Sequence, residues 1–168
     1  MEESLTQNLT ESIKNVLGLK EISPAQLSPL VLAYIGDSIF DLVIKTYLLD
    51  TKGNMQVNKL NRFASNIVKA QSQSEMIGII EPLLSPAEEA VYKRGRNAKS
   101  YTSAKNASIS DYRRATGFEA LMGYLYLEGE YERMVQLIKA GLDSFHLILI
   151  MFCVRVIIYS LMVILASR

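Results

Sequence analysis

The chain has 168 residues, of which 49% are hydrophobic, and its 18 Lys and Arg against 17 Asp and Glu give a formal net charge of +1. This length is sufficient for one domain with a proper core, and the near-neutral charge excludes attraction of a polyanion by the molecule as a whole. A single cysteine, Cys153, excludes an internal disulfide framework and fits a reducing compartment. The N-terminal residues contain no basic segment followed by an apolar one, so we expect no secretory signal and a cytoplasmic location.

Apolar residues recur with helical spacing along most of the chain, and no segment alternates convincingly like a strand, so the sequence predicts an all-α fold. We expect a first, weak helix over about 2–17 that ends at Gly18. The segment SPAQLSPL supplies Ser and Pro at helix-start positions before a strong helix over about 29–49. A third helical segment, in one or two pieces, precedes Pro82.

The second half of the chain begins with a clear helix start. Ser85 stands at an N-cap position, with Pro86 first and Glu88 third in the helix, and Gly95 is expected to end it. Residues 96–110 form a polar loop, whose length suggests a functional role. Ser108 or Ser110 then caps a helix through DYRRATGFEALMGYLYLEG, and a last amphipathic helix covers about 130–141. No repeat and no domain boundary is evident before residue 144.

Two apolar helices retain isolated acids. Asp37 and Asp41 are the only charged residues between positions 24 and 44, and Glu119 is the only one between 115 and 127. Small residues near Glu119, namely Thr116, Ala120 and Gly123, permit another helix to approach closely. A carboxylate in an apolar helix is costly to bury unless its charge is compensated.

Two interpretations of these acids remain open from the residues alone. Each acid either caps a helix or forms a salt bridge at a helix edge, or the acids of both helices converge on a divalent cation such as Mg²⁺, which prefers oxygen ligands. A single histidine, His146, and the single cysteine argue against zinc and against a Cys/His nucleophile. No glycine-rich phosphate loop is present.

The motifs resemble those of the ribonuclease III family. AYIGDSIFD is similar to the family signature in which a Gly-Asp pair lies in a helix, and TGFEALMGYLYLEG is similar to its second motif. KRGRNAKS, at 93–100, narrows the resemblance to Mini-ribonuclease III, the short subfamily that lacks a double-stranded-RNA-binding domain. The resemblance covers about residues 22–143, which we take as the catalytic domain, between an N-terminal extension at 1–21 and a tail at 144–168.

The resemblance implies a helical, homodimeric Mg²⁺-dependent endonuclease that cuts both strands of an RNA duplex, leaving 5′-phosphate and 3′-hydroxyl ends. It also implies that the substrate is the large-subunit (23S) ribosomal RNA precursor, with a ribosomal protein as a further candidate partner. Carried over by position, Asp37 and Glu119 are the catalytic metal ligands. Two further acids of full-length ribonuclease III are replaced here by Ala33 and Thr116, and Asp41 either supports the site or pairs outward with Lys45.

A basic segment follows the fourth predicted helical region and precedes Glu119. Such a run is either a solvated face or a nucleic-acid surface. A-form RNA is bound through phosphates and 2′-hydroxyls in its shallow minor groove, which suits Arg, Lys, Asn and Ser side chains. We therefore expect RNA contacts from Lys93, Arg94, Arg96, Asn97 and Lys99, and also from Lys105, Arg113 and Arg114, of which the last two have salt bridges as an alternative role.

The C-terminal segment over 145–166 lies outside the resemblance. Its roughly 20 apolar residues are enough to span a bilayer, despite Arg155. The segment is therefore a membrane anchor, a helix packed on the body, or a non-native end. Besides the nuclease, the sequence leaves open a catalytically silent RNA-binding or ribosome-associated module and a membrane-anchored helical protein with a vestigial nuclease motif.

Overall fold

A computed structural model of the chain describes residues 9–99 and 108–144. These residues form helices and connections without any strand, which confirms the all-α prediction. The helices are α1 (Leu9–Leu17), α2 (Pro29–Lys52), α3 (Val57–Val68), α4 (Ala70–Ile80), α5 (Pro86–Arg96) and α6 (Ile109–Leu127), followed by a last helix over 131–144 and accompanied by short 3-10 turns at Pro24–Gln26 and Glu81–Leu83.

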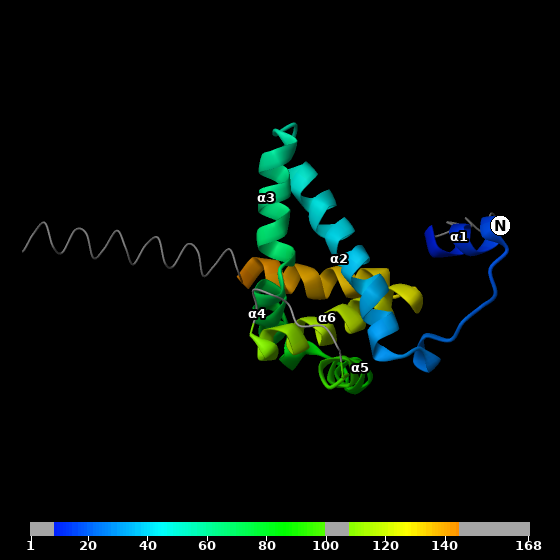
Figure 1. The fold of residues 1–168 in the computed structure, drawn as a ribbon. Coiled ribbons are helices and arrows are strands. Elements are labelled where there is room, and N and C mark those ends of the chain that lie inside the picture. The colour runs from blue at the N-terminus through cyan, green and yellow to red at the C-terminus, as the bar shows by residue number, and fades with distance from the viewer. Residues whose placement is uncertain (1–8, 100–107, 145–168) are drawn as a thin grey trace, which may run out of the picture.

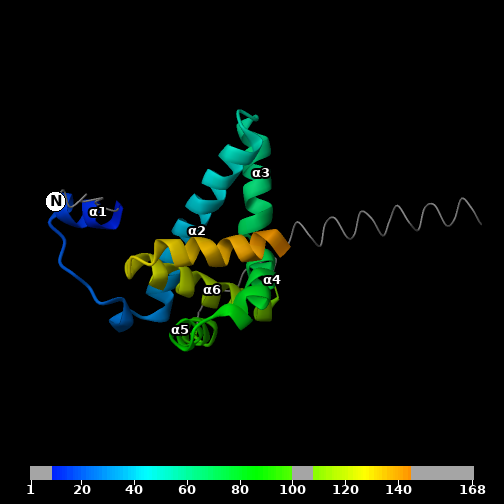
Figure 2. The same ribbon diagram turned by 180° about the vertical axis from the view of Figure 1, so that it is seen from behind.

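Helix α6 lies at the centre of the fold. It packs against α2, α4 and α5, and it is buried along most of its length. Figure 1 shows α2 and α3 extending side by side away from this centre, while α5 lies at the opposite end of the molecule. In the reverse view of Figure 2, the last helix runs along α6, and α1 lies to one side at the end of an extended segment.

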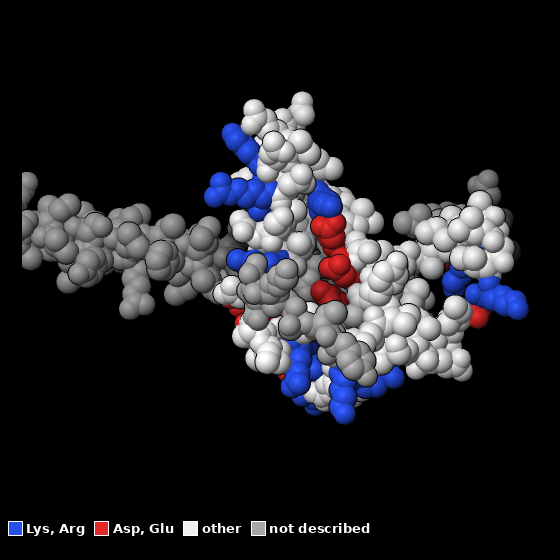
Figure 3. All heavy atoms as spheres, viewed as in Figure 1, with Lys and Arg blue, Asp and Glu red and all other residues white. Residues whose placement is uncertain are grey.

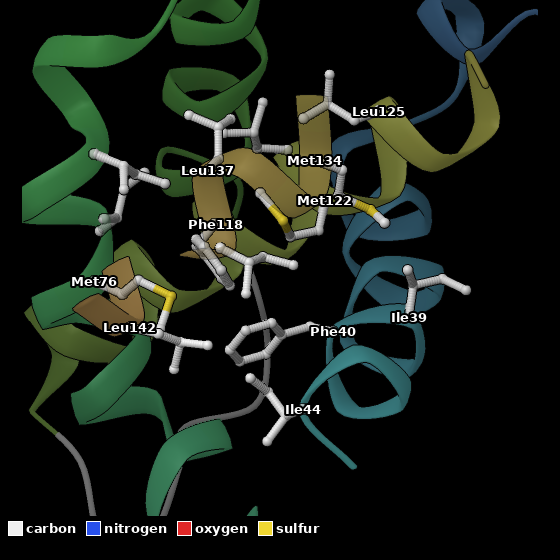
Figure 4. Packing of buried hydrophobic residues seen from close by; sticks show 14 of the residues in the cluster. Ile39, Phe40, Ile44, Met76, Phe118, Met122, Leu125, Met134, Leu137 and Leu142 are labelled. Atoms are coloured by element: carbon white, nitrogen blue, oxygen red, sulfur yellow. The ribbon is translucent and has the colours of Figure 1, made fainter. Parts of the chain in front are cut away.

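The main core forms where α2, α4, α6 and the last helix meet (Figure 4). The Phe40 and Phe118 rings pack edge to face at 4.9 Å between centroids, and both side chains are fully buried. Met76 of α4 and Leu137 of the last helix close the cluster. Because burying one such side chain stabilises the fold by about 1.5–3 kcal/mol, this core fixes the relative positions of the helices that carry the acids.

The helix starts predicted from the sequence are present. The Ser28 and Ser108 hydroxyls accept hydrogen bonds from the backbone of the first turns of α2 and α6. At α5, the Ser85 hydroxyl accepts from the Glu88 amide and the Glu88 carboxylate accepts from the Ser85 amide, which completes a capping box. Arg133 of the last helix also binds the buried Glu88 carboxylate through two N–H groups, at 2.8 and 2.9 Å.

Two helix ends differ from expectation. The third helical segment divides into α3 and α4 at Lys69, whose ψ of 151° is extended rather than helical. Gly95 does not end α5, which continues to Arg96, because this glycine is buried against Gly117 and Ala120 of α6 and serves packing instead. The predicted first helix is described only from Leu9 onward.

Among residues 9–99 and 108–144, no helix is both long and apolar enough to cross a membrane. The segment over 145–166, for which the sequence leaves an anchor, a packed helix and a non-native end open, lies outside the described residues.

Candidate catalytic metal site

Two glycines let α2 and α6 cross with their backbones in contact. A Cβ added at Gly36 would overlap the carbonyl oxygen of Glu119, and one added at Gly123 would overlap the carbonyl oxygen of Leu32. The close approach expected from the small residues of α6 is therefore present. Since Asp37 follows Gly36 directly, the crossing brings Asp37 of one helix beside Glu119 of the other.

The two carboxylates differ in exposure and influence each other. Asp37 is exposed, whereas Glu119 is half-buried. Burial and the neighbouring Asp37 charge raise the pKa of Glu119 to about 7, against an ordinary value of 4.5. The pKa of Asp37 is also raised, first by desolvation and then by the Asp41 charge. Negative charge thus accumulates where it is poorly solvated.

Asp41 takes the outward role that the sequence left open. Its Oδ2 lies 2.6 Å from Nζ of Lys45, one turn along α2. Both groups are partly exposed, so this pair contributes little to stability. Asp41 nevertheless remains near enough to Asp37 to raise that residue's pKa.

Asp37 and Glu119 fit a hard divalent cation. In the described part of the chain, neither carboxylate forms an ion pair with Lys or Arg, so their charge lacks a protein partner. No group of three or more His, Cys, Asp or Glu converges within these residues. A pair of carboxylates completed by water and substrate phosphate is a common arrangement for Mg²⁺.

Basic side chains flank the acidic site on one face of the molecule. Figure 3 shows a row of acidic side chains over α2, with basic side chains over α5 on one side of it and over α3 on the other. Gly95, in the last turn of α5, packs against Ala120, the residue after Glu119. The basic end of α5 is therefore anchored next to the carboxylates.

The predicted RNA-contacting residues are placed as follows. Arg94, Asn97 and Lys99 are exposed at the end of α5. Lys93 is exposed but pairs with Glu89 at 2.6 Å, and the Arg96 guanidinium lies over the Tyr92 ring. These five side chains share one end of the molecule.

The remaining candidates are more dispersed. Arg113 is exposed on the first part of α6, whereas Arg114 is partly buried and donates from Nη2 to the Ser74 carbonyl at 3.0 Å. Arg114 therefore ties α6 to α4. Lys105 lies outside the described residues.

One polar side chain at the site was not predicted. Gln73 of α4 is 1% exposed, and its side-chain amide forms a hydrogen bond with the Glu119 carboxylate. In the sequence, Gln73 stands in a polar run, AQSQSE, that resembles a solvated helix face. Only the packing of α4 against α6 reveals its position.

Comparison with known proteins accounts for this constellation. Residues 30–130 match the Ribonuclease III domain family, and this match includes both Asp37 and Glu119. The chain belongs to the ribonuclease III family. The matched region also includes all of α6 and most of α2, the two helices that form the site.

Several relatives define the subfamily. The chain is 52% identical over 120 residues to Mini-ribonuclease 3 of Clostridium tetani, a match that covers 71% of this chain and 80% of the relative. It is 48% identical over 117 residues to Mini-ribonuclease 3 of Thermoanaerobacter sp., covering 70% and 82%. Within the ribonuclease III family, the chain thus belongs to the Mini-ribonuclease 3 group and is an endoribonuclease.

A solved structure has the same helical arrangement. An X-ray structure of a protein from Fusobacterium nucleatum superimposes with a TM-score of 0.64 at 28% sequence identity. The match covers 71% of this chain and 94% of that protein. The ribonuclease III domain thus accounts for the helical body of the chain.

Proposed function

We propose that this chain is an Mg²⁺-dependent endoribonuclease that cleaves double-stranded RNA, with Asp37 and Glu119 as the catalytic metal ligands. The observation that carries this proposal is the α2–α6 crossing, which brings two carboxylates together without a Lys or Arg partner among the described residues. Such a pair is unfavourable in the absence of a cation. Membership of a metal-dependent nuclease family supports the same conclusion.

The chemistry is hydrolysis of a phosphodiester bond. A bound divalent cation supplies a water of lowered pKa and offsets charge on the phosphate. Asp37 and Glu119 hold that cation at an accessible position on the surface. Attack of water at phosphorus breaks the bond to the 3′ oxygen, which takes up a proton, and leaves a 5′-phosphate and a 3′-hydroxyl.

The basic end of α5 positions the substrate. Arg94, Arg96 and Lys99 lie near the acidic site, where they attract phosphates without reading bases. An RNA duplex suits such a surface, because its shallow minor groove is bound mainly through phosphates and 2′-hydroxyls. The remaining proposed contacts are Lys93, Asn97, Lys105, Arg113 and Arg114.

The chain's relatives and its family resemblance point to a biological substrate. The group shared with the Mini-ribonuclease 3 relatives supports maturation of the ends of the 23S ribosomal RNA precursor in the cytoplasm. A ribosomal protein is a further proposed partner. A role at a membrane is proposed only if the segment over 145–166 acts as an anchor.

An exposed apolar stripe on α2 supports the proposed homodimer. Val31, Tyr34, Leu42 and Leu49 lie on one side of the helix, with exposed fractions of 48, 79, 51 and 61%. Isolated exposed apolar residues are normal, but a stripe of four along a helix that carries a catalytic acid indicates an interface. A second copy on this face would place two active sites near one duplex.

A catalytically silent RNA-binding module is the alternative. Asp37 and Glu119 argue against it, because a module that only binds a polyanion has no use for two adjacent, poorly solvated carboxylates. The proposal is tested with a labelled RNA duplex and the full chain, in Mg²⁺ and in EDTA, with Asp37→Asn and Glu119→Gln alongside. Cutting that requires the cation and is lost in both variants supports the proposal. Binding of the duplex without cleavage in Mg²⁺ favours the silent module.

A further inference from the structure

The joint between α3 and α4 contains a buried polar pair beside the catalytic site. Because the helix breaks at Lys69, carbonyl groups in the last turn of α3 lack their usual helical partners. The Ser72 hydroxyl donates to the Asn66 carbonyl at 2.7 Å, and Nε2 of Gln73 donates to the Val68 carbonyl at 3.0 Å. Both side chains therefore cap the end of α3.

Gln73 also contacts the active site, which Ser72 does not. A primary amide has two N–H donors, and the Gln73 amide uses one toward Val68 and forms a second hydrogen bond with the Glu119 carboxylate. The side chain is 1% exposed, so it has little freedom to move away from either partner. Gln73 thus connects a fixed backbone carbonyl to the carboxylate at the α2–α6 crossing.

The other end of the amide is unpaired. Gln73 Oε1 is buried and has no hydrogen-bond partner among the described residues. A buried acceptor without a partner costs about 1–3 kcal/mol, and such groups concentrate where a water, an ion or catalysis accounts for them. If Gln73 served only to cap α3, an apolar neighbour to Glu119 would avoid this cost.

We propose that Gln73 is a positioning residue for the cation site, which holds the Glu119 carboxylate beside Asp37 through its side-chain amide. This inference rests on the proposed function. Groups that hydrogen-bond to metal ligands fix ligand orientation, and their loss typically reduces metal affinity about 10–100-fold. The free Oε1 is an acceptor of the kind that water bound to a cation requires.

The test measures Mn²⁺ binding to the RNA-free full chain by the loss of the free-ion EPR signal. Gln73→Met keeps the side-chain length and removes both donors, and it is expected to weaken binding by roughly 10-fold. Ser72→Ala is the matched control, because it removes the neighbouring cap of α3 without touching Glu119. It should lower stability and leave Mn²⁺ affinity unchanged. Wild-type affinity in Gln73→Met would overturn the inference.

A Glu119→Gln sample separates this inference from the proposed function. If wild type binds Mn²⁺ and Glu119→Gln does not, the cation site is real and Gln73→Met decides the role of Gln73. If wild type and Glu119→Gln bind Mn²⁺ equally, the cation site itself is refuted, and the inference with it.

A measurement on the unmodified protein covers the case in which Gln73→Met does not fold. In a ¹⁵N–¹H NMR titration with Mg²⁺, the side-chain NH₂ signals of Gln73 should shift with the same midpoint as the backbone amide of Glu119. The exposed Gln136, which donates to Glu132, provides the control and should not shift. A stationary Gln73 pair beside a shifting Glu119 amide would contradict the proposal.

Discussion

The carboxyl group of Glu119 is half-buried at the α2–α6 crossing beside Asp37, and both conditions raise its pKa, to about 7. Its ordinary value is 4.5. The folded protein therefore holds this proton more tightly than the unfolded chain does. Between these two pH values protonation favours the folded state, so the stability of the cation-free protein falls as the pH rises.

Replacing the carboxyl group by an amide should remove this destabilisation. In EDTA at pH 8, we expect Glu119→Gln to be more stable than wild type by about 1–3 kcal/mol, because the pKa difference corresponds to about 3 kcal/mol at most. Urea denaturation at pH 5 and pH 8 measures the effect. The gain should largely disappear at pH 5, where Glu119 is mostly protonated in the folded state.

The exposed Glu128 supplies a control, since Glu128→Gln should show no comparable gain between the two pH values. A Glu119→Gln variant that is equally destabilised at both pH values would indicate that the carboxylate is already compensated within the protein.

At the scale of the helix pair, the position of the site depends on two backbones in direct contact. Gly36 is packed against the Glu119 peptide, and Gly123 against the Leu32 peptide. Gly36→Ala would force α2 and α6 apart, because the added methyl group meets backbone atoms rather than a flexible side chain. We expect a loss of about 3 kcal/mol or more in the free energy of unfolding and a large loss of cleavage activity.

Gly78→Ala is the control for this substitution. Gly78 lies in α4, and a methyl group there meets only the Arg114 guanidinium, the far end of a flexible side chain. Its effect on stability should be small, since alanine is favoured over glycine in a helix interior. If Gly36→Ala matched wild type in both stability and cleavage, the contact between the helices would not determine the site.

Helix starts were predictable because they depend on local chemistry. Ser85, Pro86 and Glu88 form a capping box whose parts are adjacent in the sequence, and the structure confirms it. The close approach of another helix to α6 was also predictable, because Gly123 interrupts an apolar run with a very small side chain.

Features that depend on distant partners were not predictable. Gly95 has the usual composition of a helix end, yet its partners are Gly117 and Ala120, so it lies inside α5. The break at Lys69 has no Gly or Pro to mark it, and Gln73 joins Glu119 only because α4 packs on α6. The Arg114 bond to Ser74 likewise spans 40 residues of sequence.

For the whole molecule, the account requires an assembly that presents two catalytic centres to one duplex. The apolar stripe of α2 is the proposed contact between subunits. Leu42→Glu places a charge in the middle of this stripe, and we expect it to shift the protein from dimer to monomer in light scattering. The mass of one chain is 18.8 kDa, which makes the two states easy to separate.

Val135→Glu is a matched change outside the stripe. Val135 is also exposed, at 46%, but it lies on the last helix, and its replacement should leave the dimer intact. A wild-type chain that is monomeric at all concentrations, or a Leu42→Glu variant that remains dimeric, would refute the proposed interface.

The central claim is that Asp37 and Glu119 act together on one cation, and a double-mutant cycle in single-turnover cleavage of an RNA duplex with Mg²⁺ tests it most directly. Removing a group that supports metal chemistry should cost several kcal/mol of transition-state stabilisation, so Asp37→Asn and Glu119→Gln should each lower the rate by about 100-fold or more. If both residues serve the same cation, the double variant should be little slower than the slower single variant. Losses that multiply, or a single variant with the wild-type rate, would contradict the account.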